Sequence, residues 1–99
     1  MGDLKSYKDL IVWQKSIALV SDVYSFTKSF PAEEKFGLTS QIRRAAVSIP
    51  SNIGEGYGRA TTKYYIQFLR ISRGSLFELE TQLLIAKNLK FITNSETID

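Results

Sequence analysis

The sequence predicts an all-α protein: an antiparallel up-and-down helical bundle with three long helices and the start of a fourth. Three observations lead to this prediction. Apolar residues recur at the three- and four-residue spacing of helices over three long stretches. Phe30-Pro31 and the glycines that follow Ile53 separate those stretches. Helix-capping patterns occur at Thr61 and again after Thr93. At 99 residues we expect one domain spanning residues 1–99.

The first helix, predicted over about residues 8–29, carries two apolar stripes on its helical wheel. One stripe consists of Trp13, Ile17, Val20 and Tyr24, and the other of Val12, Leu19, Val23, Phe26 and Phe30. A helix buried on one side needs a single stripe. The second stripe therefore indicates either several neighbours within the chain or an interface with another subunit. We expect an oligomer interface at Val12, Leu19, Val23 and Phe26. The sequence leaves open which stripe faces the neighbouring subunit.

The second helix is predicted over about residues 32–57, with a kink at Pro50, and the third over about residues 61–88. The core stripe of the second helix is Leu38, Ile42, Ala45, Ala46, Ile49 and Ile53. That of the third is Tyr65, Leu69, Ser72, Leu76, Leu83 and Leu84, and Phe68 and Leu79 flank it. A fourth helix would start near residue 94. Three antiparallel helices leave a groove, which we expect a fourth helix in a longer chain or a partner to fill.

The composition argues against catalysis. The chain has neither cysteine nor histidine, so it lacks thiolate chemistry and the commonest general base and metal ligand. We expect a protein that is not an enzyme and has no cofactor and no metal. No apolar run is long enough to cross a membrane, and residues 1–6 lack the layout of a signal peptide. We therefore expect a cytoplasmic protein.

Positive charge concentrates in the middle third of the sequence. From Arg43 to Arg73 there are six basic residues and one acidic residue, although the whole chain has a net charge of only +3. Such residues neutralise nucleic-acid phosphates, and nearby tyrosines can stack on unpaired bases. The candidate RNA or DNA contacts are Arg43, Arg44, Arg59, Lys63 and Arg70. The alternative is that these side chains are ordinary solvated charges.

Two further features have structural explanations. Arg73 and Glu80 fall within the apolar sector of the third helix, where a charge needs a partner. We expect an ion network of Glu55, Arg73 and Glu80, rather than an active site. The stretch Gly54–Arg59 superficially resembles a phosphate-binding glycine loop, but it follows a helix instead of a strand. We therefore expect it to end the second helix.

Two long motifs resemble a known family. Residues 41–59, QIRRAAVSIPSNIGEGYGR, and residues 68–83, FLRISRGSLFELETQL, are similar to the signatures of the four-helix-bundle family linked to 23S ribosomal RNA intervening sequences. Residues 10–15 and 30–38 fit its opening and its first connection, so the resemblance covers about residues 7 to 92. Gly54 and Lys90 depart from it, where alanine and glycine are usual.

The resemblance implies a fourth helix and assembly as a homopentamer. Some members are encoded within insertions in 23S rRNA genes. A similar bundle, the accessory protein of diversity-generating retroelements, forms a pentameric ring that binds reverse transcriptase and nucleic acid. The leading hypothesis is a non-enzymatic, pentameric protein associated with RNA or DNA. The alternative is a scaffold ring that binds a protein partner and does not bind nucleic acid directly.

Overall fold

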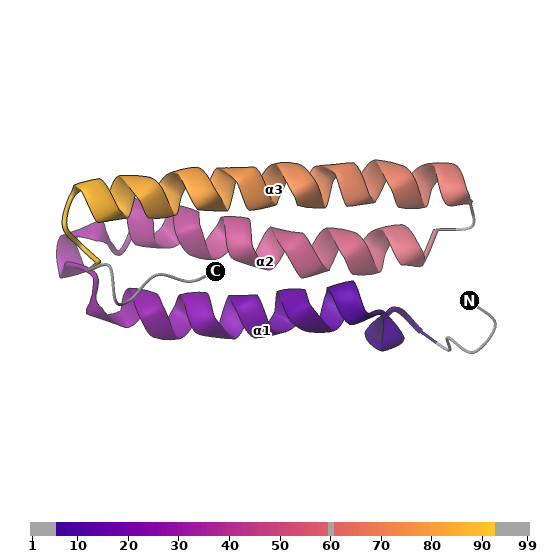
Figure 1. The fold of residues 1–99 in the computed structure, drawn as a ribbon, viewed down its shortest axis with the longest axis horizontal. Helices are drawn as coiled ribbons and strands as arrows, with labels where there is room; N and C mark the ends of the chain where they lie inside the picture. Colours follow the sequence, from indigo (N-terminus) through magenta and orange to yellow (C-terminus); the bar gives the residue numbers. More distant parts are fainter. Residues whose placement is uncertain (1–5, 60, 93–99) are drawn as a thin grey trace.

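The computed structural model describes residues 6–59 and 61–92. Within these ranges the fold is helical, with three long helices: α1 (Ile11–Phe26), α2 (Leu38–Tyr57) and α3 (Thr62–Asn88). Successive helices run in opposite directions, and α2 packs against both α1 and α3 (Figure 1). The prediction of a helical fold with three long helices is confirmed. The predicted start of a fourth helix near residue 94 lies outside the described residues.

The first predicted helix is divided into three parts. A 3-10 turn, η1 (Tyr7–Asp9), precedes α1, and a second one, η2 (Thr27–Ser29), follows it. The break comes at Leu10, whose backbone is extended. Ser6 caps the start of η1 by accepting from the Lys8 N–H, so η1 has an N-cap of its own, separate from α1. The periodicity missed this division, because apolar spacing continues through the break.

Helix α2 begins later than predicted and then continues through Pro50. A third 3-10 turn, η3 (Ala32–Glu34), occupies the start of the predicted range, and the Glu34 carboxylate accepts from the Leu38 N–H at 3.0 Å. Proline removes one backbone donor from a helix interior. Around Pro50, side chains supply donors to the carbonyls of the preceding turn: Ser51 donates to Val47, Asn52 to Ser48 and Ser72 to Ile49.

Helix α3 is capped at both ends. Thr61, the predicted N-cap, accepts from the Tyr64 N–H at 3.3 Å. At the other end Lys90 adopts a left-handed backbone, with φ at 64°, and the Phe91 N–H donates to the Ala86 carbonyl at 2.9 Å. This is a Schellman motif, in which glycine is usual at the left-handed position. The motif turns Phe91 back onto Phe30, with ring centroids 5.7 Å apart.

The core centres on α2. Ile42, Ala46 and Ile53 are almost fully buried, as their predicted stripe requires, and they meet Val23 from α1 and Leu79 and Ala86 from α3. The prediction for α3 is partly wrong. Leu76 and Leu84 are exposed, whereas Leu79 is 1% exposed. Helix α3 has apolar residues beyond one stripe, so its periodicity alone shifted the predicted buried face toward Leu76 and Leu84.

Candidate nucleic-acid interface

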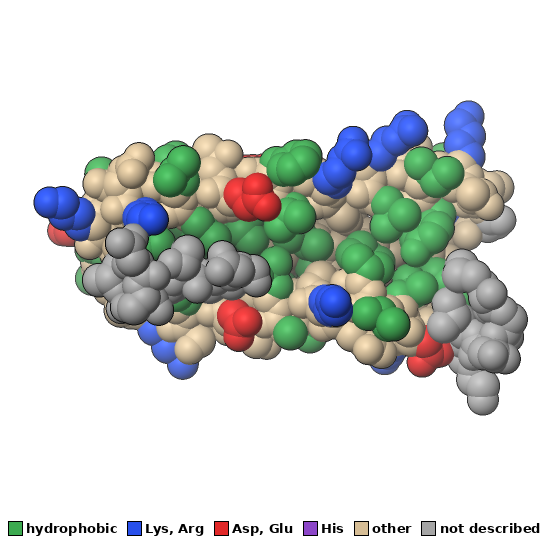
Figure 2. All heavy atoms as spheres, viewed as in Figure 1, with side chains coloured by type: hydrophobic (Ala, Val, Ile, Leu, Met, Phe, Trp, Pro, Cys, Tyr) green, Lys and Arg blue, Asp and Glu red, His purple; other side chains and the backbone are tan. Residues whose placement is uncertain are grey.

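Four of the five predicted phosphate contacts are exposed. Arg44 lies on α2, Arg59 just beyond its end, and Lys63 and Arg70 on the first half of α3. Figure 2 shows Lys and Arg side chains gathered over this first half of α3. From Thr62 to Phe77 the helix contains no acidic residue. Phosphates can therefore approach Lys63 and Arg70 without competition from carboxylates on the same stretch of α3.

Arg59 is oriented by two neighbours. Its Nη2 lies 2.7 Å from Glu55 Oε1 one helical turn earlier, with about half of each side chain exposed. Its guanidinium carbon also lies 5.2 Å from the centroid of the Phe68 ring. A pair this exposed contributes little stability. The contacts therefore hold Arg59 at the junction of α2 and α3 and leave it accessible to solvent.

Arg43 differs from the other candidates because it is half-buried and held on three sides. Its Nε donates to Thr27 Oγ1 at 2.8 Å, and its Nη2 donates to the Tyr24 carbonyl at 3.3 Å. The guanidinium carbon also lies 4.5 Å from the Tyr24 ring centroid. A cation beside the last carbonyls of α1 is favourable for the helix dipole. Arg43 thus fastens α2 to the end of α1.

A basic hollow of about 310 Å³ lies beside Arg43, where α1 turns into α2. We use the name basic hollow for this cavity, which is lined by Thr27, Lys28, Phe30, Pro31, Ala32, Lys35, Thr39 and Arg43. The sequence reasoning missed Lys28 and Lys35, because they lie outside the basic middle third. The one signal for them in the sequence is that they flank the Phe30-Pro31 turn. In the structure this turn brings both lysines to the hollow that Arg43 of α2 also lines.

The predicted ion network of Glu55, Arg73 and Glu80 is wrong for the single chain. Glu55 pairs with Arg59, and Arg73 and Glu80 are exposed. They follow Ser72 and Leu79, which are the buried residues, so each points about 100° away from the face that packs on α2. Both charges are therefore solvated and need no buried partner.

The predicted oligomer interface is wrong at Val23, which is 0% exposed within the chain. Leu19 and Phe26 are half-buried against the core, and Val12 is half exposed. The reason is that α1 turns the face between its two stripes toward α2. The first stripe instead borders an apolar hollow of about 410 Å³ on the α1–α2 seam. Its lining residues are Tyr7, Trp13, Ile17, Val20, Val47, Pro50, Ser51, Gly54 and Glu55.

The glycine-rich stretch ends α2, as predicted. Gly54 and Gly56 lie inside the helix, and Gly58 is its C-cap. Gly56 is buried against α3, since a Cβ there would lie 2.6 Å from the Phe68 Cβ. Its role is therefore close helix packing. The stretch does not form a loop that could surround a phosphate.

Two kinds of feature are absent from the described residues. No three side chains among His, Cys, Asp and Glu gather there in a way that could hold a metal ion. No helix of this part of the chain combines the length and apolar character that a membrane crossing requires.

Comparison with known proteins identifies one family. A family profile described as 23S rRNA-intervening sequence protein matches residues 8–99. This match covers both motifs whose resemblance the sequence had indicated. No curated protein matches the chain.

Proposed function

Because the chain belongs to the 23S rRNA-intervening sequence protein family, we propose that it is a non-enzymatic, cytoplasmic protein that associates with RNA through a basic surface. The observation that carries this proposal is the group of exposed cations on α2 and the first half of α3. Arg44, Arg59, Lys63 and Arg70 are all exposed. Contacts of this kind act on the phosphate backbone and carry no sequence preference by themselves.

Arg43 contributes less to this exposed surface than the sequence predicted, because its Nε and Nη2 already donate to Thr27 and to the Tyr24 carbonyl. Aromatic stacking has one accessible candidate near the cations. Tyr64 is 49% exposed, while Tyr57 and Tyr65 pack edge to face with ring centroids 6.1 Å apart. Tyr64 can therefore offer a free ring face to an unpaired base.

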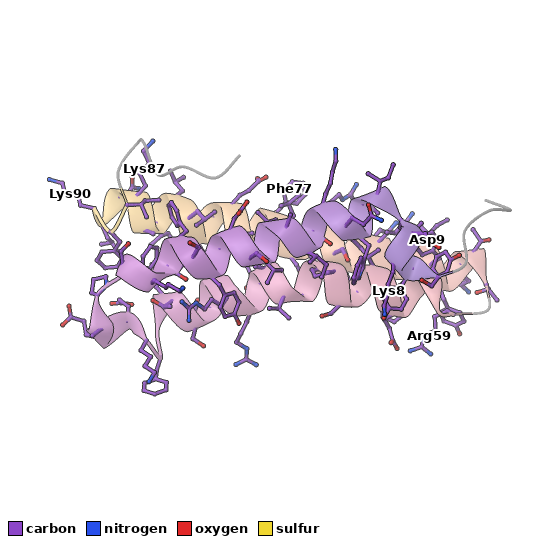
Figure 3. The ribbon with its side chains drawn as sticks, turned by 90° about the horizontal axis from the view of Figure 1, so that it is seen from below. Lys8, Asp9, Arg59, Phe77, Lys87 and Lys90 are labelled. Atoms are coloured by element: carbon purple, nitrogen blue, oxygen red, sulfur yellow. The ribbon has the colours of Figure 1, made fainter. Side chains whose placement is uncertain are left out.

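A triple substitution tests the proposal. Arg59→Gln, Lys63→Gln and Arg70→Gln together should weaken binding of a fluorescent single-stranded RNA by about 100-fold at low salt, since three phosphate contacts are lost. The control combines Lys15→Gln, Lys87→Gln and Lys90→Gln, which removes equal charge elsewhere. Figure 3 shows Lys87 and Lys90 at the opposite end of the bundle from Arg59. Equal losses in both variants would contradict a localised RNA surface.

We also propose that the chain assembles as a homopentamer and that a fourth helix completes each bundle. Exposed apolar side chains support both. Figure 2 shows apolar side chains along the band between α1 and α3, and Phe77 and Leu84 are more than half exposed on α3. Ile17 and Val47, which line the apolar hollow, are each about 40% exposed. Light scattering that reports a monomer would contradict the assembly.

A second candidate function is a scaffold ring that binds a protein partner and has no direct contact with nucleic acid. The same exposed apolar side chains favour it, because patches of this kind mark protein interfaces. A pull-down from cell extract separates the two functions. A single protein that stays bound after nuclease treatment, together with no affinity of the purified protein for RNA, would favour the scaffold.

A further inference from the structure

The basic hollow combines features that the exposed cations lack. Three cationic side chains border one concave space: Lys28 from η2, Lys35 from the turn before α2, and Arg43 from α2. None of the eight lining residues is acidic. Of the neighbouring acids, Glu34 is engaged at the start of α2, where its carboxylate accepts from the Leu38 N–H. The lining itself therefore carries three positive charges and no negative one, which favours an anion in the hollow.

Arg43 is held in place before any ligand arrives. Its contacts with Thr27 and Tyr24 occupy Nε and one N–H of Nη2. Within the described residues, the two N–H groups of Nη1 have no partner. Thr27 is itself fixed, because its hydroxyl donates to the Val23 carbonyl at 2.8 Å. A fixed guanidinium with free donors loses little conformational entropy when it binds an anion.

The rest of the lining suits a small, highly charged oxyanion. Thr39 is buried and adds a second threonine to the wall, while Phe30, Pro31 and Ala32 supply an apolar floor. Lys28 and Lys35 are exposed and can move. The Lys35 ammonium lies 5.4 Å from the centroid of the Phe36 ring, so it remains near the solvent edge. A volume of about 310 Å³ accommodates a phosphate together with its ribose.

We propose that the basic hollow binds a phosphate group of RNA, with Arg43 as the fixed donor and Lys28 and Lys35 as mobile cations that close on it. This inference rests on the proposed RNA association and adds a defined site to it. The exposed cations on α3 would hold the backbone further along the same RNA. The hollow would position one phosphate at the turn between α1 and α2.

Inorganic phosphate tests the hollow separately from RNA. In amide NMR spectra recorded at constant ionic strength, adding phosphate in exchange for chloride should shift the amide signals of Thr27, Lys28, Lys35 and Thr39 to saturation. The variant Lys28→Gln/Lys35→Gln should weaken this phosphate affinity by about tenfold, while Lys15→Gln, on the exposed side of α1, should leave it within twofold. Shifts that do not saturate, or that are equal in both variants, would overturn the proposal.

RNA binding then tests the source of the phosphate. For single-stranded RNA, Lys28→Gln/Lys35→Gln should reduce the slope of log affinity against log salt by about 0.7, since the hollow holds one phosphate and each lost phosphate contact contributes about 0.7. If RNA binds the wild-type chain with salt dependence and this variant behaves like Lys15→Gln, the hollow proposal fails and the proposed function stands. If phosphate saturates the hollow but RNA does not bind at all, both the proposed function and the assignment to RNA fail.

Discussion

The two sides of α2 differ in how closely the neighbouring helix approaches. Toward α3, a Cβ on Gly56 would lie 2.6 Å from the Phe68 Cβ. Toward α1, a Cβ on Gly54 would lie 3.4 Å from the Tyr7 ring and 3.7 Å from Trp13 Nε1, which are ordinary contact distances. The apolar hollow opens on the α1–α2 seam, and the basic hollow lies where the chain turns from α1 into α2. The α2–α3 contact, which we call the closed seam, therefore holds the helices together. The α1–α2 contact, the open seam, leaves concave surfaces available to other molecules.

The largest effect expected is that of Gly56→Ala, which would break the closed seam. Alanine favours a helix over glycine by about 1 kcal/mol, but here the new methyl group meets a Cβ that cannot move without the α3 backbone. Overpacking should dominate, and the free energy of unfolding should fall by about 2 kcal/mol. Urea denaturation followed by circular dichroism measures it. Unchanged or greater stability would show that the two helices are not in close contact at Gly56.

Ser72→Ala should weaken the same seam by a smaller amount. The Ser72 hydroxyl is buried and donates to the Ile49 carbonyl at 3.0 Å. Removing a buried hydrogen bond should lower the free energy of unfolding by about 1 kcal/mol. Ser51→Ala is the matched control, because the Ser51 hydroxyl also donates to a carbonyl of α2 but is exposed. If Ser72→Ala and Ser51→Ala lowered the free energy of unfolding equally, the Ser72 hydrogen bond would not stabilise the α2–α3 seam.

Gly54→Ala tests the α1–α2 seam and should change the free energy of unfolding least of the three substitutions. The space beside Tyr7 admits a methyl group, and alanine restricts the unfolded chain more than glycine does. The free energy of unfolding should rise by about 0.5 kcal/mol, measured under the same denaturation conditions as for Gly56→Ala. A loss as large as that of Gly56→Ala would mean that the α1–α2 seam is as closed as the α2–α3 seam.

Sequence periodicity predicted α2 well, because Ile42, Ala46 and Ile53 form one narrow stripe and all three are buried. The periodicity was less reliable for α1 and α3, whose apolar residues cover more than one face. For these two helices it could not tell the side that meets α2 from the sides beside it. It therefore placed Val23 at a subunit interface and Leu84 in the core, whereas Val23 is 0% and Leu84 58% exposed.

The site was less predictable, because it depends on how the chain reverses. Lys28, Lys35 and Arg43 are separated along the sequence and meet only through the turn at Pro31. Counting charges along the sequence could detect the dense middle third but not a group that the connection between α1 and α2 brings up to Arg43. The pairing of Glu55 is a different case. It pairs with Arg59, four residues further along the chain, and not with the remote Arg73, so the local partner was readable from the sequence.

Binding of single-stranded RNA to the wild-type chain over a range of salt concentrations tests the central claim, RNA association through phosphate contacts, most directly. With about five such contacts, log affinity should fall against log salt with a slope of about −3.5. A slope near zero, or a dissociation constant in the millimolar range at low salt, would contradict it.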